Sequence, residues 1–106
     1  MKEAKYFLAV RFSIEPQAEA EVMRWLEGGH AAEVAKQPGF LWCRKIKGEN
    51  RTYMMLYGIE SKAAFLSYEN NLPLKKKFAD ERAPFEKHMK IDRFHGEVDF
   101  SAESSK

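Results

Sequence analysis

The sequence predicts an α+β fold whose elements follow the order strand, helix, strand, strand, helix, strand. Three observations predict it: runs rich in aromatic and β-branched residues, intervening segments whose apolar residues recur every three or four positions, and Pro or Gly between the segments. With 106 residues, of which 44% are hydrophobic, the chain is long enough for one core. We therefore expect a single domain over residues 1–100, followed by a polar tail at 101–106 that frays.

The first strand is predicted over residues 5–14, which are rich in aromatic and β-branched side chains. Pro16 stops this strand and suits the first position of a helix, because the N–H that proline lacks has no helical partner there. The apolar residues that follow have helical spacing: Ala18, Val22 and Leu26. Gly28 and Gly29 are expected to break or end this helix, and a further helical turn precedes a turn at residues 37–39.

The second and third strands are predicted over residues 40–47 and 51–60, with a hairpin-type loop at residues 48–50 between them. One face of the second strand is expected to carry Phe40, Trp42 and Ile46, and the other face Cys43, Lys45 and Lys47. In the third strand, Tyr53, Met55, Tyr57 and Ile59 share one face, and Met54 and Leu56 share the other.

The last third of the chain predicts two helical pieces and a strand. Ser61 is a candidate N-cap for the first piece, because its hydroxyl can accept a backbone N–H of the first turn. Pro73 interrupts this helix, and Pro84 is expected to perturb the end of the second piece. The last strand is predicted over residues 89–98.

With right-handed crossovers, this order gives the ferredoxin-like βαββαβ arrangement, an antiparallel sheet with the helices on one face. The first and third strands are then central. An antiparallel sheet with one wet face alternates apolar and polar residues, but these two strands do not alternate cleanly. The first strand is mixed on its second face, with Phe7, Ala9, Arg11 and Ser13, and the third strand is apolar on both faces, so the sheet face away from the helices is also expected to be covered. We therefore expect a second copy of the chain or a ligand to cover that face.

Charge and cysteine content exclude several classes of protein. The 18 basic and 16 acidic residues give a net charge of +2, which argues against a dedicated nucleic-acid binder. Residues 51–55 do not match an RNA-recognition motif on the third strand. A single cysteine, Cys43, excludes an internal disulfide and a multi-cysteine metal site. The short apolar stretch near the N-terminus predicts neither a signal peptide nor a membrane span, so we expect a cytoplasmic protein.

Two segments resemble a known superfamily. Trp25-Leu26-Glu27-Gly28-Gly29-His30, followed by Val34 and Pro38-Gly39-Phe40, resembles the first helix and second strand of the dimeric α+β barrel superfamily, which includes EthD-like proteins and antibiotic-biosynthesis monooxygenases. Residues 53–57, Ala63-Ala64-Phe65, Tyr68 and Leu72-Pro73 are similar to the third strand and second helix of a small bacterial family in that group. The resemblance covers residues 6–98.

This resemblance implies a homodimer in which two sheets pack face to face, with an apolar cavity in each subunit or between the sheets. It also implies cofactor-free oxygenation, isomerisation, cyclisation or lactone chemistry on aromatic and polyketide-like molecules. Two departures matter. EthD-like chains often have proline two residues after the histidine, where this chain has Ala32, and the haem-degrading members share an asparagine on the first strand that this strand lacks. Haem degradation is therefore not expected.

His30 is the first candidate for catalysis. It is expected to start a short helical turn, where the helix N-terminus disfavours the imidazolium and keeps the ring neutral near pH 7. A neutral ring can act as a base or a hydrogen-bond donor. The alternative is that His30 only caps the turn or forms a local hydrogen bond. Arg11, in an otherwise apolar strand, is expected to bind an anionic substrate group or to pair with Asp92.

Tyr57 is the third catalytic candidate, because a phenol can steady developing negative charge. The residues expected to bind substrate are aromatic, methionine and histidine side chains: Tyr6, Trp25, Trp42, Tyr53, Met55, Tyr68 and His95. Each of the aromatic and Met residues has the alternative of an ordinary core or interface position. His95, Glu97 and Asp99 alternate along the last strand, but such residues near a polar terminus are usually solvated, so no metal site is expected. The run Lys75-Lys76-Lys77 is expected to be a solvated helix face.

The sequence therefore favours a small enzyme that needs no cofactor and acts on a hydrophobic aromatic or polyketide-like molecule, by isomerase, cyclase, lyase or monooxygenase chemistry. The alternative is a non-catalytic homodimer that binds a small molecule as a carrier or sensor. Neither interpretation includes a nucleic-acid or membrane partner.

Overall fold

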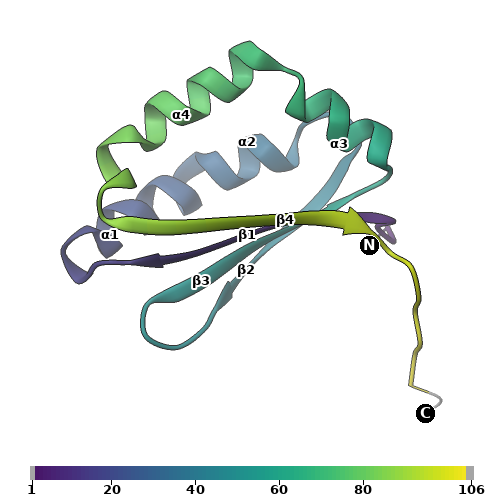
Figure 1. Cartoon of the computed structure of the whole chain (residues 1–106), viewed down its shortest axis with the longest axis horizontal. Helices are drawn as coiled ribbons and strands as arrows, with labels where there is room; N and C mark the ends of the chain where they lie inside the picture. The colour runs from purple at the N-terminus through teal and green to yellow at the C-terminus, as the bar shows by residue number, and fades with distance from the viewer. Residues whose placement is uncertain (1, 105–106) are drawn as a thin grey trace.

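A computed structural model describes residues 2–104 of the chain as one antiparallel sheet with all helices on one of its faces (Figure 1). The elements are β1 (Tyr6–Ile14), α1 (Pro16–Trp25), η1 (Leu26–His30), α2 (Ala31–Ala35), β2 (Phe40–Lys47), β3 (Thr52–Ile59), α3 (Lys62–Glu69), α4 (Leu72–Glu86) and β4 (Met89–Glu97). The strand order is β2-β3-β1-β4, so β1 and β3 are central, as predicted. The predicted ferredoxin-like α+β fold is confirmed for the single chain.

The first helical region is kinked rather than ended at its glycines. Pro16 begins α1, and the helix passes into the π-helical turn η1 without a break. At Gly29 the backbone leaves the helical region (φ 162°, ψ −34°), and the chain then enters α2 at Ala31. The kink turns the residues on its two sides, Trp25 and His30, toward each other, and their rings stack.

Phe40 lies on the opposite face of β2 from the one predicted. A β-bulge lies between Phe40, which pairs with Ile59, and Trp42, which pairs with Gly58. The extra residue turns Phe40 to the helix-facing side, where it is buried. Trp42 stays on the outer face with Ile46, because both pair with outward-facing residues of β3.

Side chains begin both C-terminal helices. The hydroxyl of Ser61 accepts a hydrogen bond from the Ala64 N–H at 3.1 Å, which confirms the predicted N-cap of α3. The carboxamide oxygen of Asn71 accepts from the Leu74 N–H at 3.2 Å and begins α4, with Pro73 in its first turn. Pro84 lies inside α4, which nevertheless continues to Glu86.

Smaller differences occur at strand ends. β3 begins at Thr52 because Asn50 and Arg51 form the turn with positive φ angles of 55° and 56°. Of the predicted tail, residues 101–104 have no regular structure and residues 105–106 lie outside the described part of the chain. Within that part, every helix is too short or too polar to cross a lipid bilayer.

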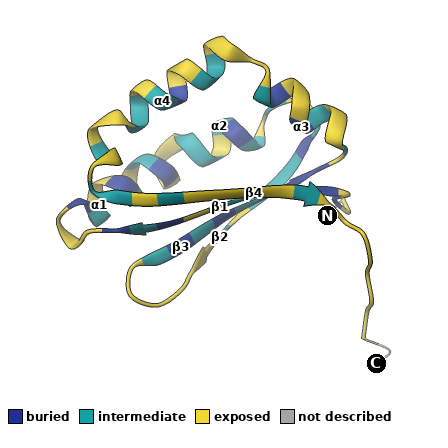
Figure 2. Cartoon of the chain, viewed as in Figure 1, coloured by how far each residue is buried: buried dark blue, intermediate teal, exposed yellow. Residues whose placement is uncertain are grey.

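The core lies between the sheet and the helices (Figure 2). Every second residue of the two central strands is buried there, with one exception, Val10: Tyr6, Leu8, Phe12 and Ile14 of β1 and Tyr53, Met55, Tyr57 and Ile59 of β3. These side chains pack against apolar residues of the helices, among them Val22, Val34, Phe65 and Phe78. The edge strand β4 contributes no fully buried residue.

Substitution of Gly39 tests the backbone geometry of the turn that connects α2 to β2. Its φ is +82°, and a Cβ there would lie 2.3 Å from the Cβ of Ala64. Gly39→Ala is therefore expected to lower the free energy of unfolding by about 2 kcal/mol or more. Gly28→Ala is the matched control, because a Cβ at Gly28 meets nothing within 4 Å. The control is expected to be neutral or to stabilise by about 0.5–1 kcal/mol, as measured by urea unfolding. Equal stabilities of the two variants would contradict the turn geometry.

Candidate functional site

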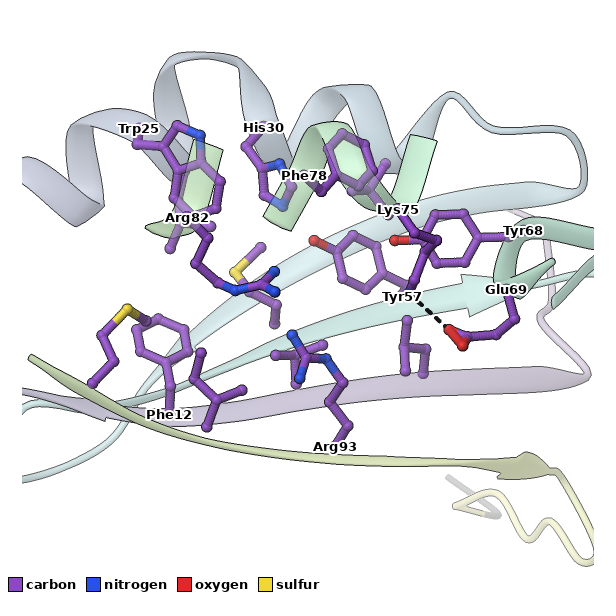
Figure 3. Close-up of a pocket in the computed structure, with 17 residues that line it drawn as sticks. Phe12, Trp25, His30, Tyr57, Tyr68, Glu69, Lys75, Phe78, Arg82 and Arg93 are labelled. Carbon is purple, nitrogen blue, oxygen red and sulfur yellow. Dashed lines mark hydrogen bonds and ion pairs between the residues drawn. The ribbon is translucent and has the colours of Figure 1, made fainter. Parts of the chain in front are cut away.

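A cavity of about 350 Å³ lies between the sheet and the helices (Figure 3). Strands β1, β3 and β4 form its floor, which is mostly apolar: Leu8, Val10, Phe12, Met55, Tyr57, Met89, Ile91 and Arg93. The helices provide the opposite wall: Trp25, Leu26, His30, Val34, Tyr68, Glu69, Lys75, Phe78 and Arg82. Because Arg93 is an exposed residue that also lines the cavity, the cavity reaches solvent on the β4 side.

His30 is enclosed by aromatic rings in the helical wall. Its ring stacks on Trp25, with centroids 4.1 Å apart, and meets the ring of Phe78 edge-on at 4.6 Å. Its side chain is only 11% exposed. The buried Nδ1 atom has no hydrogen-bond partner, and the nearest carboxylate, that of Glu81, is 3.9 Å away. One ring nitrogen, Nδ1, is therefore left without a hydrogen-bond partner.

Burial keeps this ring neutral. It lowers the pKa of His30 from 6.5 to about 4, and the attraction of Glu81 for the charged form offsets only part of this effect. The sequence analysis expected a neutral ring for another reason, the dipole at a helix N-terminus. His30 does begin a short helical turn, since it follows the kink at Gly29 directly and takes the N-cap position of the five-residue helix α2, but burial is the largest cause that lowers its pKa.

His30 also separates the cavity from an open groove on the outside of the helical region. The groove is formed by residues before and after the kink and by the end of α4: Arg24, Trp25, Gly28, Gly29, His30, Glu33, Glu81 and Phe85. The Trp25 indole N–H donates to the Glu81 carboxylate at 3.4 Å on this side. Trp25 and His30 thus face the cavity on one side and the open groove, which Glu81 also lines, on the other.

Two phenols line the cavity. Tyr57 comes from β3 and Tyr68 from α3, and both residues are buried. Burial raises the pKa of Tyr57 far above its usual value of 10, and it raises the pKa of Tyr68 to about 12. Both groups therefore stay protonated at neutral pH, so each can donate a hydrogen bond to a ligand.

Charged side chains approach the cavity from two sides. In Figure 3 the guanidinium groups of Arg82, from α4, and Arg93, from β4, point toward each other across the space. Lys75 lies nearer the start of α4, and its ammonium group forms an ion pair with Glu69 at 2.9 Å. The cavity thus combines an apolar floor with a cationic rim.

The structure brings together part of the predicted set. The residues that line the cavity are His30, Tyr57, Trp25, Met55 and Tyr68. Tyr6 and His95 lie on the helix-facing side of the sheet but outside the cavity, and the Tyr6 hydroxyl and His95 Nδ1 are hydrogen-bonded at 2.8 Å. Tyr53 is also buried on this side and donates a hydrogen bond to Glu19.

Arg11 and Trp42 lie on the other face of the sheet. Arg11 is opposite Asp92 in the β1–β4 register, the neighbour that the sequence analysis considered for it. Trp42 covers Gly58, where an added Cβ would come within 2.4 Å of the indole. Neither side chain lines the cavity, because both belong to the alternate, outward-facing positions of their strands.

The sequence analysis missed Arg82 and Arg93. Arg93 shares a strand face with Met89 and Ile91, so the argument applied to Arg11, a charge among apolar residues, could have found it. Lys75 was included in the predicted solvated run. The prediction suits Lys76, which pairs with Asp80 on the helix surface, but not Lys75, which lines the cavity. Within residues 2–104, the His, Cys, Asp and Glu side chains form no cluster of three or more that could hold a metal ion.

No protein-family model and no curated protein matches the sequence. Solved structures do match over nearly the whole chain. A candidate antibiotic biosynthesis monooxygenase from Deinococcus radiodurans has a TM-score of 0.75 and 9% identity, covering 95% of this chain and 99% of that chain. The cofactor-independent oxygenase SnoaB from Streptomyces nogalater has a TM-score of 0.72 and 16% identity, covering 95% and 99%. The heme-degrader MhuD from Mycobacterium tuberculosis, with two hemes in its active site, has a TM-score of 0.69 and 17% identity, covering 92% and 99%.

These similarities confirm that the chain has the fold of the antibiotic-biosynthesis-monooxygenase-like proteins, in agreement with the predicted resemblance to the dimeric α+β barrel superfamily. The low identities limit that conclusion to the fold.

The buried neutral ring of His30 predicts a pH dependence of stability. The pKa is about 4 in the folded chain and near 6.5 in the unfolded chain, so only the unfolded chain gains a proton between these values. Stability due to the neutral ring is therefore complete above the unfolded pKa and is lost as the pH falls toward 4. Wild type is expected to lose roughly 3 kcal/mol more than His30→Gln over this interval, in urea unfolding at several pH values. Parallel curves for the two proteins would contradict the buried, neutral state.

Proposed function

We propose that this chain is a small enzyme that works without a bound cofactor on a hydrophobic aromatic or polyketide-like molecule in the cavity. The observation that carries the proposal is the buried ring of His30, which lines an apolar cavity and has an unpartnered Nδ1. Because the ring is neutral and lines the cavity, we propose that one of its nitrogens accepts a substrate proton there. SnoaB, a cofactor-independent oxygenase, shares the fold and supports this class of chemistry.

In the proposed mechanism, the neutral His30 ring takes a proton from an acidic C–H or phenolic O–H of the substrate. The Tyr57 hydroxyl, joined by that of Tyr68, donates to the oxygen on which negative charge develops. A pKa of about 4 makes His30 a weak base in the empty cavity. Negative charge that forms beside the ring favours the imidazolium and raises this pKa, so the base strengthens in the complex. Isomerisation or cyclisation then follows from the substrate anion itself. Oxygenation also requires molecular oxygen, which takes electrons from the anion, leaves one oxygen atom in the product and releases the other as water.

We also propose that the outer face of the sheet forms a homodimer. Phe94 and Ile46 lie on this face and are 72% and 48% exposed. Phe7 and Trp42 extend the same apolar surface and contact each other edge-on at 5.6 Å. A second copy that packs against this surface removes it from water, at about 25 cal/mol for each Å² buried. Arg11 would then lie within or beside this interface.

The assay for turnover uses dithranol, an anthrone, as a probe substrate, with oxygen uptake and quinone absorbance as readouts. Wild type is expected to accelerate its oxidation in the presence of a metal chelator. His30→Gln is expected to lower kcat by about 100-fold or more, because it removes the base and keeps a polar side chain. His88→Gln is the matched control, since His88 pairs with Glu15 away from the cavity.

Full activity of His30→Gln would remove His30 from the mechanism. If dithranol instead raises the melting temperature of wild type without being converted, the alternative function, a non-catalytic ligand carrier or sensor, replaces the enzyme.

The dimer is tested by Phe94→Glu with Leu72→Glu as its control. Leu72 begins α4 on the helical side and is 71% exposed, almost the same as Phe94. Wild type and Leu72→Glu are expected to have the mass of two chains in small-angle scattering, and Phe94→Glu the mass of one, because the charge would be buried in the interface. A wild type that scatters as one chain would contradict the proposed dimer.

A further inference from the structure

The cavity has a surplus of positive charge. The side chains that line it include three cations, Arg82, Arg93 and Lys75, and one carboxylate, Glu69, while His30 is neutral. Glu69 is already engaged, since it pairs with Lys75 at 2.9 Å. The two arginines therefore have no anionic partner among the side chains that line the cavity.

Arg82 is only weakly paired elsewhere. Its Nε atom is buried and has no hydrogen-bond partner. The nearest carboxylate oxygen, on Glu86, is 3.7 Å from Nε, well beyond the 2.7–2.9 Å that is typical of a charge-assisted hydrogen bond. Glu86 is also half exposed, so water screens its charge. A buried guanidinium N–H without an acceptor is costly, and a ligand oxygen in the cavity would supply that acceptor.

Arg93 faces Arg82 from the opposite wall. It lies on β4, on the same strand face as Met89 and Ile91, which also line the cavity. Partial removal from water and the nearby charge of Arg82 both lower the pKa of Arg93. Two guanidinium groups directed at one space repel each other, and an anion placed between them turns this repulsion into two attractions.

We propose that the cavity binds a ligand with an apolar, ring-containing body and one anionic group of the carboxylate or sulfonate type, and that Arg82 and Arg93 hold this group from opposite sides. The planar guanidinium fork matches the paired oxygens of such groups. The inference rests on the proposed function in placing the ligand in the cavity, and it adds the chemical class of that ligand. A small inorganic anion would leave the apolar floor empty, whereas a neutral hydrocarbon would leave both arginines without an acceptor.

The test compares two fluorescent probes that share one aromatic body. 8-Anilino-1-naphthalenesulfonate carries the anion, and N-phenyl-1-naphthylamine lacks it. Wild type is expected to bind the sulfonate at least about tenfold more tightly than the neutral probe. Arg82→Met and Arg93→Met are each expected to weaken sulfonate binding by about tenfold or more and to leave binding of the neutral probe unchanged.

Two controls locate the binding site. Arg24→Met removes the same charge from the outer groove and is expected to change neither affinity. Val10→Phe, on the cavity floor, is expected to weaken both probes because the larger side chain occupies their space. Circular dichroism of each variant establishes that it is folded.

Equal affinities for the two probes, with no effect of either arginine substitution, would overturn the anion class. Sulfonate binding that survives Val10→Phe, or that falls in Arg24→Met as much as in Arg82→Met, would also overturn it by placing the anion outside the cavity. None of these outcomes depends on turnover of dithranol. Failure of the anion class therefore remains distinguishable from failure of the proposed enzyme.

Discussion

The structure depends on one requirement: the apolar, helix-facing side of the central strands β1 and β3 must be buried beneath the helices. Burial of each large side chain on β1 and β3 contributes about 1.5–3 kcal/mol. At one end, aromatic rings fill the space: Tyr6 packs on Phe65, and Phe40 packs on Tyr68, with centroids 5.3 and 5.0 Å apart. At the other end α4 does not close on the sheet, and the cavity remains.

The polar groups of this cavity are those that a purely structural core would avoid. The Nδ1 of His30 and the Nε of Arg82 are buried without a hydrogen-bond partner, and both residues line the cavity. Each reduces stability in the empty protein, since burial of an unsatisfied polar group costs about 1–3 kcal/mol. Their position in one cavity, beside two protonated phenols, is the pattern expected of a binding site rather than of packing alone.

Local chemistry made much of the fold predictable. The Ser61 cap, Pro16 at the start of α1 and the turn before Phe40 act through neighbouring residues, so their signals are visible in the sequence. The side on which Phe40 lies was not predictable, because a bulge depends on how β2 meets β3. The site was found only in part for a similar reason. His30 and Tyr57 were identified by residue type and resemblance, whereas the role of Arg82 depends on the distance between α4 and the sheet, which no local pattern encodes.

The position of His30 between the cavity and the outer groove has a consequence for substitutions at this residue. The His30 ring separates the cavity from the outer groove that Arg24 and Glu81 line. Truncation to alanine would remove the base and also connect the cavity to the outer groove beside Trp25, which gives water a second route in addition to the opening on the β4 side. A loss of activity in that variant would then combine two effects: the missing proton acceptor and the increased access of water to the cavity. A side chain of similar size, such as glutamine, fills the space beside Trp25, so its effect on activity reports the loss of the proton acceptor alone.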